Sequence, residues 1–203
     1  NWQRARVTKA RYQAKIANKR KDYLHKITTE LVKSYDVIVI EDLKTKNLLK
    51  NHHLAKSIAN NSWYLFREML EYKCKWYGKQ LVVVSPNYTS QICSRCGYHS
   101  GKKPLDVREW ICPKCNTHHD RDINASINIL NRGLKELKKI LTKREYDVAI
   151  LRYGFYSEPM KFKDIADTLG VNEKRAQALD LQVRKKLKKY NSVKEYYELI
   201  HQK

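Results

Sequence analysis

The first 34 residues place apolar side chains at helical spacing inside a strongly basic segment. This segment holds ten Lys or Arg residues and two acids. Its apolar positions recur at steps of four or seven residues, as on one helix face: Tyr12, Ile16, Tyr23, Ile27 and Leu31. We therefore predict one long basic amphipathic helix over residues 1–34. The run Lys19, Arg20 and Lys21 indicates contact with phosphates, although a solvated face is the alternative for any single lysine.

The pattern changes in residues 35–133. The stretch "YDVIVIEDL" is short and β-branched, which predicts a buried strand ending at Glu41 and Asp42. The stretch "QLVVVSP" predicts a second strand. Between them, "SWYLFREMLEYKCKWYG" predicts a helix with Ser62 as its cap and Gly78 as its stop. The preceding "NLLKNHHLAKSIANN" predicts a mobile or helical connector.

A cysteine-rich insert follows the second strand and leads into another helix. We predict this helix from about Ile123, with one apolar face made by Ile127, Leu130, Leu134 and Leu137. The order strand, helix, strand, insert and helix is typical of an α/β fold. Residues 134–203 differ, because short apolar patches alternate with the helix breakers "YGFYSEP" and "TLGVN". They predict a separate all-helical domain.

The charge of the chain narrows its possible partners. Lys and Arg number 42 against 21 Asp and Glu, a formal net charge of +21 at pH 7. Such an excess favours a polyanionic partner, usually nucleic acid, while a merely basic protein is the alternative. No apolar run long enough to span a membrane occurs, and the charged first residues lack the apolar core of a signal peptide. We expect a cytoplasmic protein with no membrane partner.

Four of the five cysteines form two C-x-x-C pairs with ribbon spacing. Cys93 and Cys96 are followed after fifteen residues by Cys112 and Cys115, which is within the spacing of zinc ribbons. Four thiolates close a tetrahedral shell without an open position, so the predicted zinc is structural. Gly97 relieves the tight turn after the first pair. The alternative ligands His118 and His119 are expected at the surface or beside the thiolates, and Cys74 as a small buried apolar residue.

Two acids follow the second cysteine pair in the motif D-R-D. Asp120 and Asp122 stand where a helix is predicted to start, and acids at that place usually cap the helix. Glu41 at a strand end is, by itself, a surface acid. Taken together, a strand-end carboxylate and a helix-start carboxylate can meet at one end of an α/β sheet. Carboxylates gathered there hold Mg²⁺ for phosphodiester chemistry.

Several stretches, in order, resemble the C-terminal half of the TnpB family of transposon-encoded, RNA-guided nucleases. They are "YDVIVIEDLKTKNLL", "SWYLFREMLEYKCKWYGKQLVVVSPNYTSQICSRCG" and "CPKCNTHHDRDINASINIL", preceded by "IANKRKDYLHKITTELV", which is similar to the basic helix ahead of the family's second catalytic motif. The resemblance covers residues 1–133. It implies an RNase H-like, RuvC-type α/β nuclease core, partial here, with a zinc ribbon inserted at about 88–118. DNA and a guide RNA are the implied partners.

Matched by motif, Glu41 corresponds to the family's catalytic glutamate and Asp122 to its last catalytic aspartate, both as Mg²⁺ ligands. Arg121, the middle residue of D-R-D, is a candidate nucleic-acid contact. The family's first catalytic aspartate, in the context I-D-x-G, has no counterpart here. The N-terminal lobe has none either, and the chain begins with Asn1. These differences predict either a fragment of a longer chain or a shortened, nuclease-inactive descendant.

The stretch "LTKREYDVAILRYGFYSEPMKFKDIADTLGVNEKRAQALDLQVRKKL" resembles region four of bacterial sigma factors. Independently, "FKDIADTL", a turn at Gly170 and a helix capped by Asn172 indicate a helix-turn-helix. The second helix would enter the major groove. Its candidate nucleic-acid contacts are Lys174, Arg175, Gln177 and Lys185. The family often has glutamine at the position of Ala178 and arginine at that of Glu173, and a generic three-helix accessory domain is the alternative.

Three functions follow as hypotheses. The first is an RNA-guided DNA endonuclease with an added DNA-binding tail. The second is a nuclease-inactive, RNA-guided regulator whose tail contacts promoter DNA or RNA polymerase. The third is a plain zinc-ribbon and helix-turn-helix transcription regulator, which the pairing of "EDL" with "DRD" disfavours.

Overall fold

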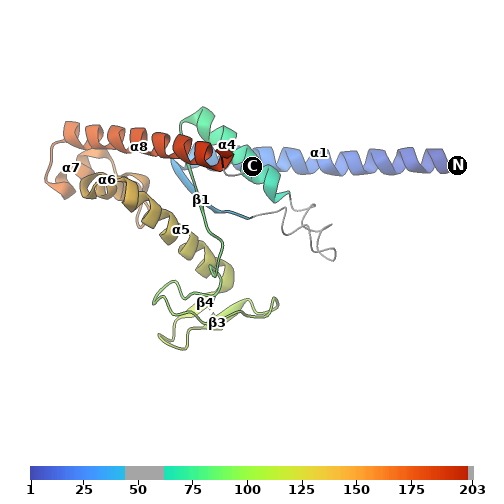
Figure 1. Cartoon of the computed structure of the whole chain (residues 1–203), viewed down its shortest axis with the longest axis horizontal. Coiled ribbons are helices and arrows are strands. Elements are labelled where there is room, and N and C mark those ends of the chain that lie inside the picture. Colours follow the sequence, from blue (N-terminus) through green and yellow to red (C-terminus); the bar gives the residue numbers. More distant parts are fainter. Residues whose placement is uncertain (44–61, 201–203) are drawn as a thin grey trace. The chain divides into compact units, whose positions relative to one another are not determined.

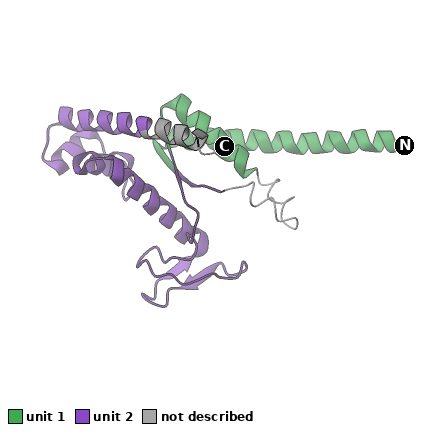
Figure 2. Cartoon of the chain, in the orientation of Figure 1, with its two compact units in different colours: residues 1–38, 44–81 green, residues 39–43, 82–203 purple. Residues whose placement is uncertain are grey.

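A computed structural model describes residues 1–43 and 62–200 of the chain, with side chains to residue 189. The described residues fall into two compact units (Figure 2). Unit 1 comprises residues 1–38 and 44–81, and unit 2 comprises residues 39–43 and 82–203. The connector predicted at residues 47–61 lies outside the described residues. The described helices include none that is both long and apolar enough to cross a membrane.

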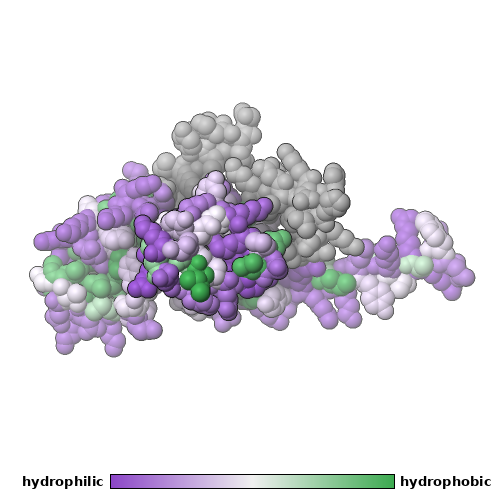
Figure 3. Space-filling view, turned by 90° about the horizontal axis from the view of Figure 1, so that it is seen from below, coloured by the Kyte–Doolittle hydropathy of each residue, from purple (hydrophilic) through white to green (hydrophobic). Residues whose placement is uncertain are grey.

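Unit 1 is built from two helices, α1 (Trp2–Ser34) and α4 (Trp63–Tyr77) (Figure 1). The single long basic helix predicted for residues 1–34 is confirmed. Its predicted apolar face is wrong, because Tyr12, Ile16 and Tyr23 are exposed, while the buried residues are Leu24, Thr28 and Val32. The buried residues of α1 all lie in its last third, and the earlier apolar residues stand singly among hydrophilic ones (right side of Figure 3).

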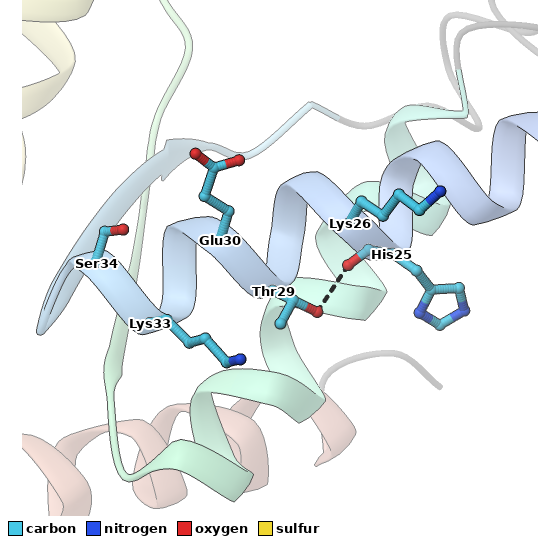
Figure 4. A pocket seen from close by; sticks show the side chains of 6 residues that line it. All are labelled: His25, Lys26, Thr29, Glu30, Lys33 and Ser34. Carbon is cyan, nitrogen blue, oxygen red and sulfur yellow. Dashed lines mark hydrogen bonds between the residues drawn. The ribbon is translucent and has the colours of Figure 1, made fainter.

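A buried lysine joins the two helices of unit 1. Lys73 of α4 is 5% exposed and donates hydrogen bonds of 2.7 Å to three oxygens of α1. These are the backbone carbonyl of His25 and the hydroxyls of Thr28 and Thr29. Figure 4 shows this part of α1, where the Thr29 hydroxyl also donates to the His25 carbonyl at 2.7 Å. Burial lowers the pKa of Lys73, and neutral oxygens solvate its amine where an apolar contact would be usual.

Helix α4 connects two paired strands, β1 (Val37–Glu41) and β2 (Gln80–Val84). The Gln80 amide donates to the Asp36 carbonyl and the Asp42 amide to the Val84 carbonyl, so the strands run parallel. Both predicted strands are confirmed. The prediction that β1 is buried is wrong, because all five of its residues are half-buried. Among the described strands, β1 pairs with β2 alone, which leaves part of each side chain uncovered.

The two ends of α4 behave differently. Gly78 ends the helix in the left-handed conformation, at φ 64°, as predicted. Ser62 is the N-cap residue, as predicted, but at φ 53° its side chain makes no capping hydrogen bond. Cys74 lies buried on the same helix, where burial raises its thiol pKa to about 11. This is the inert apolar role expected of it.

In unit 2, helix α5 (Arg121–Ile140) packs directly on β1. A Cβ added to Gly133 would lie 2.7 Å from both Cγ atoms of Val39, so only glycine permits this approach. The helix begins two residues before the predicted start. Leu134 and Leu137 of the predicted apolar face are buried, but Ile127 is exposed. Polar contacts, described below, bury other residues in the first half of α5.

Three further helices complete unit 2: α6 (Lys143–Tyr153), α7 (Phe162–Leu169) and α8 (Glu173–Ile200). Their core is formed by Val148, Ile165, Ala166, Ala176 and Leu179. The predicted helix "FKDIADTL" coincides with α7, and the left-handed Gly170 ends it. The predicted cap Asn172 is confirmed, because its side-chain oxygen accepts from the Arg175 amide at 2.8 Å.

We predict that Gly133→Ala destabilises unit 2 although alanine is the better helix former. The new methyl group would overlap Val39, and overpacking of this kind costs about 1–3 kcal/mol, more than the roughly 1 kcal/mol gained in helix propensity. Chemical denaturation measures the change in the free energy of unfolding. Adding Val39→Ala should restore part of the loss, whereas the control Ser126→Ala, on the exposed face of α5, should change little. Equal stability of Gly133→Ala and the parent chain would contradict the close packing.

Candidate metal centre and carboxylate site

The two cysteine pairs adopt the same backbone turn. In each turn the residue after the second cysteine, Gly97 or Asn116, is left-handed, with φ of 73° and 55°. Its amide donates to the carbonyl of the first cysteine, Cys93 or Cys112, at 2.9 Å in both cases. Glycine and asparagine are the residues that best tolerate this conformation. The repeated turn aims two sulfurs of each pair at one point.

The four sulfurs form a group that can bind zinc. They all lie within 4.8 Å of one another, with 3.7 Å from Cys93 to Cys115 and 3.6 Å from Cys96 to Cys112. A tetrahedral site with Zn–S bonds of about 2.3 Å needs sulfur separations of about 3.8 Å. Within the described residues, this is the one cluster of three or more His, Cys, Asp or Glu side chains placed to hold a metal.

The pKa values of the cysteine thiols also indicate a site that a cation would stabilise. Hydrogen bonds from the side chain and backbone of Thr117 lower the pKa of Cys115 to about 6. The Tyr98 amide favours the Cys96 thiolate, but burial and hydrogen bonds with the other three cysteines outweigh it and raise the pKa of Cys96 to about 12. Like charges this close cannot all ionise unaided. A divalent cation bound by all four sulfurs would stabilise their thiolate forms, so the donor set fits zinc.

His119 supports the sulfur cluster, whereas His118 lies at the surface. The Nε2 atom of His119 is 3.0 Å from the Cys93 sulfur, and its ring lies 4.7 Å from that of Trp110. His119 is 7% exposed, and this burial lowers its pKa. His118 instead pairs with the exposed Glu109 at 3.3 Å. Both histidines therefore lie where the sequence placed them, one beside the thiolates and one at the surface.

The ribbon leads directly into α5. Strands β3 (Glu109–Ile111) and β4 (His118–Asp120) pair antiparallel, and β4 ends at the residue that caps the helix. The Asp120 side chain accepts from the amides of Asp122 and Ile123, at 2.9 and 2.8 Å. The first acid of D-R-D is thus engaged by the backbone. The Asp122 carboxylate is 80% exposed, with a 3.5 Å ion pair to Arg108.

A polar face of α5 forms hydrogen bonds with the backbone of the segment between β2 and the first cysteine pair. Asn124, Asn128 and Arg132 are spaced four residues apart and so share one side of the helix. Arg132 donates at 2.5 Å to the carbonyls of Ser85 and Asn87. Asn128 donates to the carbonyls of Thr89 and Ile92 at 2.8 and 2.7 Å.

Asn124, near the start of the helix, adds two further hydrogen bonds to this segment. It donates to the Ile92 carbonyl at 2.8 Å and accepts from the Ser94 amide at 2.9 Å. The two asparagines are 1% and 9% exposed, so their hydrogen bonds satisfy amides that burial would otherwise penalise. The sequence analysis missed all three residues. An N-x-x-x-N-x-x-x-R pattern on one face was the available signal.

Glu41 lies at the end of β1 in the same unit. Its Oε1 atom accepts a hydrogen bond of 2.6 Å from the Thr89 hydroxyl. The carbonyl of Thr89 also accepts from the side chain of Asn128, so Thr89 links Glu41 to α5, the helix that holds Asp122 in its first turn. The structure therefore places both predicted carboxylates in unit 2, at the end of a strand and at the start of a helix.

The predicted nucleic-acid contacts differ in their availability. Lys19 and Lys21 of α1 and Lys174, Arg175, Gln177 and Lys185 of α8 are exposed, and Arg20 is half-buried. The Gln177 amide donates to Glu173 at 3.2 Å. Arg121 donates to the carbonyls of Pro104 and Val107, at 2.8 and 3.4 Å. Its guanidinium thus fastens the ribbon loop to the start of α5.

We predict one zinc ion per chain, measurable by metal analysis after preparation without chelators. The double variant Cys93→Ser plus Cys112→Ser should abolish binding, because it leaves only two thiolates. Chelation should speed amide hydrogen exchange at residues 121–128, because metal binding is coupled to local folding. Zinc retained by the double variant, or unchanged exchange after chelation, would contradict the assignment.

We predict that the two acids of D-R-D differ in their effect on stability. Asp120→Ala removes the cap of α5 and should cost about 0.5–2 kcal/mol. Asp122→Ala loses only a favourable position near the helix dipole, about 0.3–1 kcal/mol before its exposure reduces the effect. Urea denaturation of both variants measures the difference. A larger loss for Asp122→Ala would show that the capping role has been assigned to the wrong acid.

Much of the chain matches known protein families. Residues 1–52 match the family described as "Probable transposase" (OrfB_IS605), and residues 63–129 match the "Cas12f1-like, TNB domain". A protein of Streptomyces pristinaespiralis named "Putative RNA-guided DNA endonuclease" is 50% identical over 135 residues, which are 66% of this chain and 33% of that protein. A "TnpB-like protein" of Acanthamoeba polyphaga mimivirus is 34% identical over 131 residues, or 62% of this chain and 25% of that protein.

Among solved structures, the chain is similar to one from a Cas12f1–sgRNA–target DNA complex, with a TM-score of 0.47 and 24% identity over 58% of this chain and 35% of that one. The chain spans a third or less of the length of the two relatives. The sequence matches cover the basic helix, α4, the zinc ribbon and the first half of α5. By these matches the chain is related to the TnpB-like family, which its motifs had indicated.

Proposed function

We propose that this chain serves RNA-guided, metal-dependent hydrolysis of DNA, with Glu41 and Asp122 as ligands of Mg²⁺. The names of its relatives support the reaction, since one is called an RNA-guided DNA endonuclease. The net charge of +21 supports nucleic-acid partners, DNA and a guide RNA. The exposed Lys19 and Lys21 of the basic helix would contact their phosphates.

The observation that carries this proposal is the division of roles within D-R-D. Asp120 is used as a helix cap, which leaves Asp122 exposed and able to bind a ligand. A plain helix start would need only the first acid. Glu41, which is half-buried at the end of β1, is the second oxygen donor, and the carboxylates of both residues are hard ligands suited to Mg²⁺. When bound, Mg²⁺ supplies charge stabilisation for the attacking and leaving oxygens of a phosphodiester.

The roles of the chain's own groups follow from their positions. Glu41 and Asp122 would orient the ions, while the zinc ribbon fixes the chain immediately before Asp122. Arg108 forms an ion pair with Asp122 in the described structure, and its positive charge offsets the negative charge of that carboxylate. A cation bound at Asp122 would have to compete with this exposed pair, which is weak. Two carboxylates bind Mg²⁺ less firmly than a set of three, so residues 1–203 alone should cut DNA poorly.

The decisive experiment places residues 1–133 of this chain in the matching region of the Streptomyces pristinaespiralis relative. The chimera should cut guide-directed DNA if that relative does, which is the positive control. Glu41→Ala and Asp122→Ala should each abolish cutting while leaving nucleic-acid binding intact, and Asp120→Asn should retain most of it. A chimera that still cuts with Asp122→Ala or with Glu41→Ala would refute these roles. Efficient cutting by residues 1–203 alone that Glu41→Ala abolishes would refute the expectation that this chain alone cuts poorly.

We further propose that helices α6–α8 bind duplex DNA. The start of α8 exposes Lys174, Arg175 and Gln177, where a recognition helix contacts bases. Farther along α8 the cations divide into two groups. Arg184 pairs with Asp180 at 2.8 Å and Lys186 with the buried Glu145 at 2.6 Å, so both serve the helical core. The side chain of Lys185 is exposed and would contact the DNA backbone.

We predict distinct effects for substitutions on α8 in the complete chain. Lys185→Ala should weaken binding to all duplexes alike and reduce the salt dependence by about one phosphate contact. Arg175→Ala should remove any preference among sequences, at about 1–3 kcal/mol. Electrophoretic mobility at several salt concentrations measures both, with the exposed Lys163→Ala on α7 as control. If neither variant changes duplex binding and the chain captures RNA polymerase or the guide RNA through α8, the tail is an adaptor.

A further inference from the structure

Thr89 contacts the carboxylate of Glu41 from a buried position. The residue is 6% exposed, and its hydroxyl oxygen lies 2.6 Å from Glu41 Oε1. The Pro86 carbonyl is a second acceptor, at 3.3 Å. A hydroxyl has a single proton to donate, and the shorter distance to a charged acceptor directs it to Glu41. Among the residues that the structure describes, the other buried threonine is Thr28, which donates instead to the Leu24 carbonyl of its own helix.

The backbone around Thr89 is held rigidly on its other side. The Asn128 amide donates to the Thr89 carbonyl at 2.8 Å. The preceding residue, Tyr88, has φ of 61°, and its carbonyl accepts from the amides of Gln91 and Ile92 at 3.0 and 3.1 Å. A non-glycine residue is left-handed only where its surroundings over-determine it. The Thr89 hydroxyl is therefore presented to Glu41 from a fixed support.

We propose that Thr89 is a positioning residue for Glu41. Its hydrogen bond fixes Oε1 and thereby the side-chain rotamer, so that Oε2 would be available to a cation without further loss of freedom. Thr89 also accepts from Asn128, and it thereby links Glu41 to α5, which holds Asp122 in its first turn. This inference rests on the proposed metal-binding role of Glu41. It adds a neutral hydroxyl, one that does not touch the metal, to the groups on which metal affinity depends.

The arrangement agrees with what carboxylate ligands require. A glutamate has three side-chain torsions, and a free one must lose their mobility when it binds a cation. Outer hydrogen bonds that orient a ligand beforehand remove this cost, and their loss typically weakens metal binding about 10–100-fold. Hydrogen bonding to a single oxygen also leaves the second oxygen available. Thr89 would thus improve affinity through geometry and without adding charge.

The test measures Mn²⁺ binding to the complete, zinc-loaded chain labelled with ¹³C at its glutamate carboxyls. The Glu41 resonance is identified by its absence in Glu41→Gln, and its paramagnetic broadening by Mn²⁺ gives the affinity. Thr89→Val keeps the shape but removes the hydroxyl, and should weaken binding about tenfold or more. Thr89→Ser keeps the hydroxyl and should stay within about twofold of the parent chain. Thr168→Val, which removes an exposed hydroxyl on α7, is the control.

The outcomes separate this inference from the proposed function. Parent-like affinity in Thr89→Val, or equal losses in Thr89→Val and Thr89→Ser, would overturn the positioning role. If Asp122→Ala leaves the Mn²⁺ broadening at Glu41 unchanged and Glu41→Ala leaves total Mn²⁺ binding unchanged, the metal site itself is refuted. Zinc content and melting temperature verify the fold of each variant. Should valine lower either, Thr89→Cys, which has similar volume and only a weak donor, takes its place with the same expectation.

Discussion

Hydrogen bonds from α5 to the segment between β2 and the first cysteine pair determine the arrangement of unit 2. Three side chains at steps of four residues, Asn124, Asn128 and Arg132, hydrogen-bond the backbone of residues 85–94. A loop of this length would normally expose its carbonyls to water. Here the helix supplies the donors that a neighbouring strand would supply in a sheet. The segment therefore follows α5 for more than two helical turns.

Everything that the candidate site needs is attached to this pair of segments. The first cysteine pair begins at Cys93, directly after Ile92, whose carbonyl accepts from two asparagine amides. The second pair leads through β4 to the cap of α5, so the cysteine cluster closes a ring between the segment and the start of the helix. At the other end, Gly133 brings α5 against Val39 and so against the strand that ends in Glu41. The cysteine cluster, the helix and the strand thus restrain one another.

The features that were predictable from sequence are those decided locally. The knuckles depend on four cysteines and a tight turn, and the helix stops depend on Gly78 and Gly170, so spacing and residue type were sufficient. The polar face of α5 was not predictable in this way. Apolar periodicity favoured the side with Ile127, but in the first half of α5 the buried side is set by carbonyls some thirty to forty residues earlier in the chain. The apolar face predicted for α1 failed for the same reason, since a distant lysine of α4 decides which residues are covered.

The same logic explains how two acids can share a motif and still differ in chemistry. The amides at the start of α5 attract a carboxylate, and Asp120 satisfies two of them. Asp122 lies within the first turn, where its side chain points away from those amides and into solvent. A side chain that binds a cation has to meet two conditions. Its backbone must be held firmly, and its carboxylate oxygens must remain available to the ion. The ribbon meets the first condition through β4, which leads directly into the helix, and the cap at Asp120 meets the second by sparing Asp122 from that task.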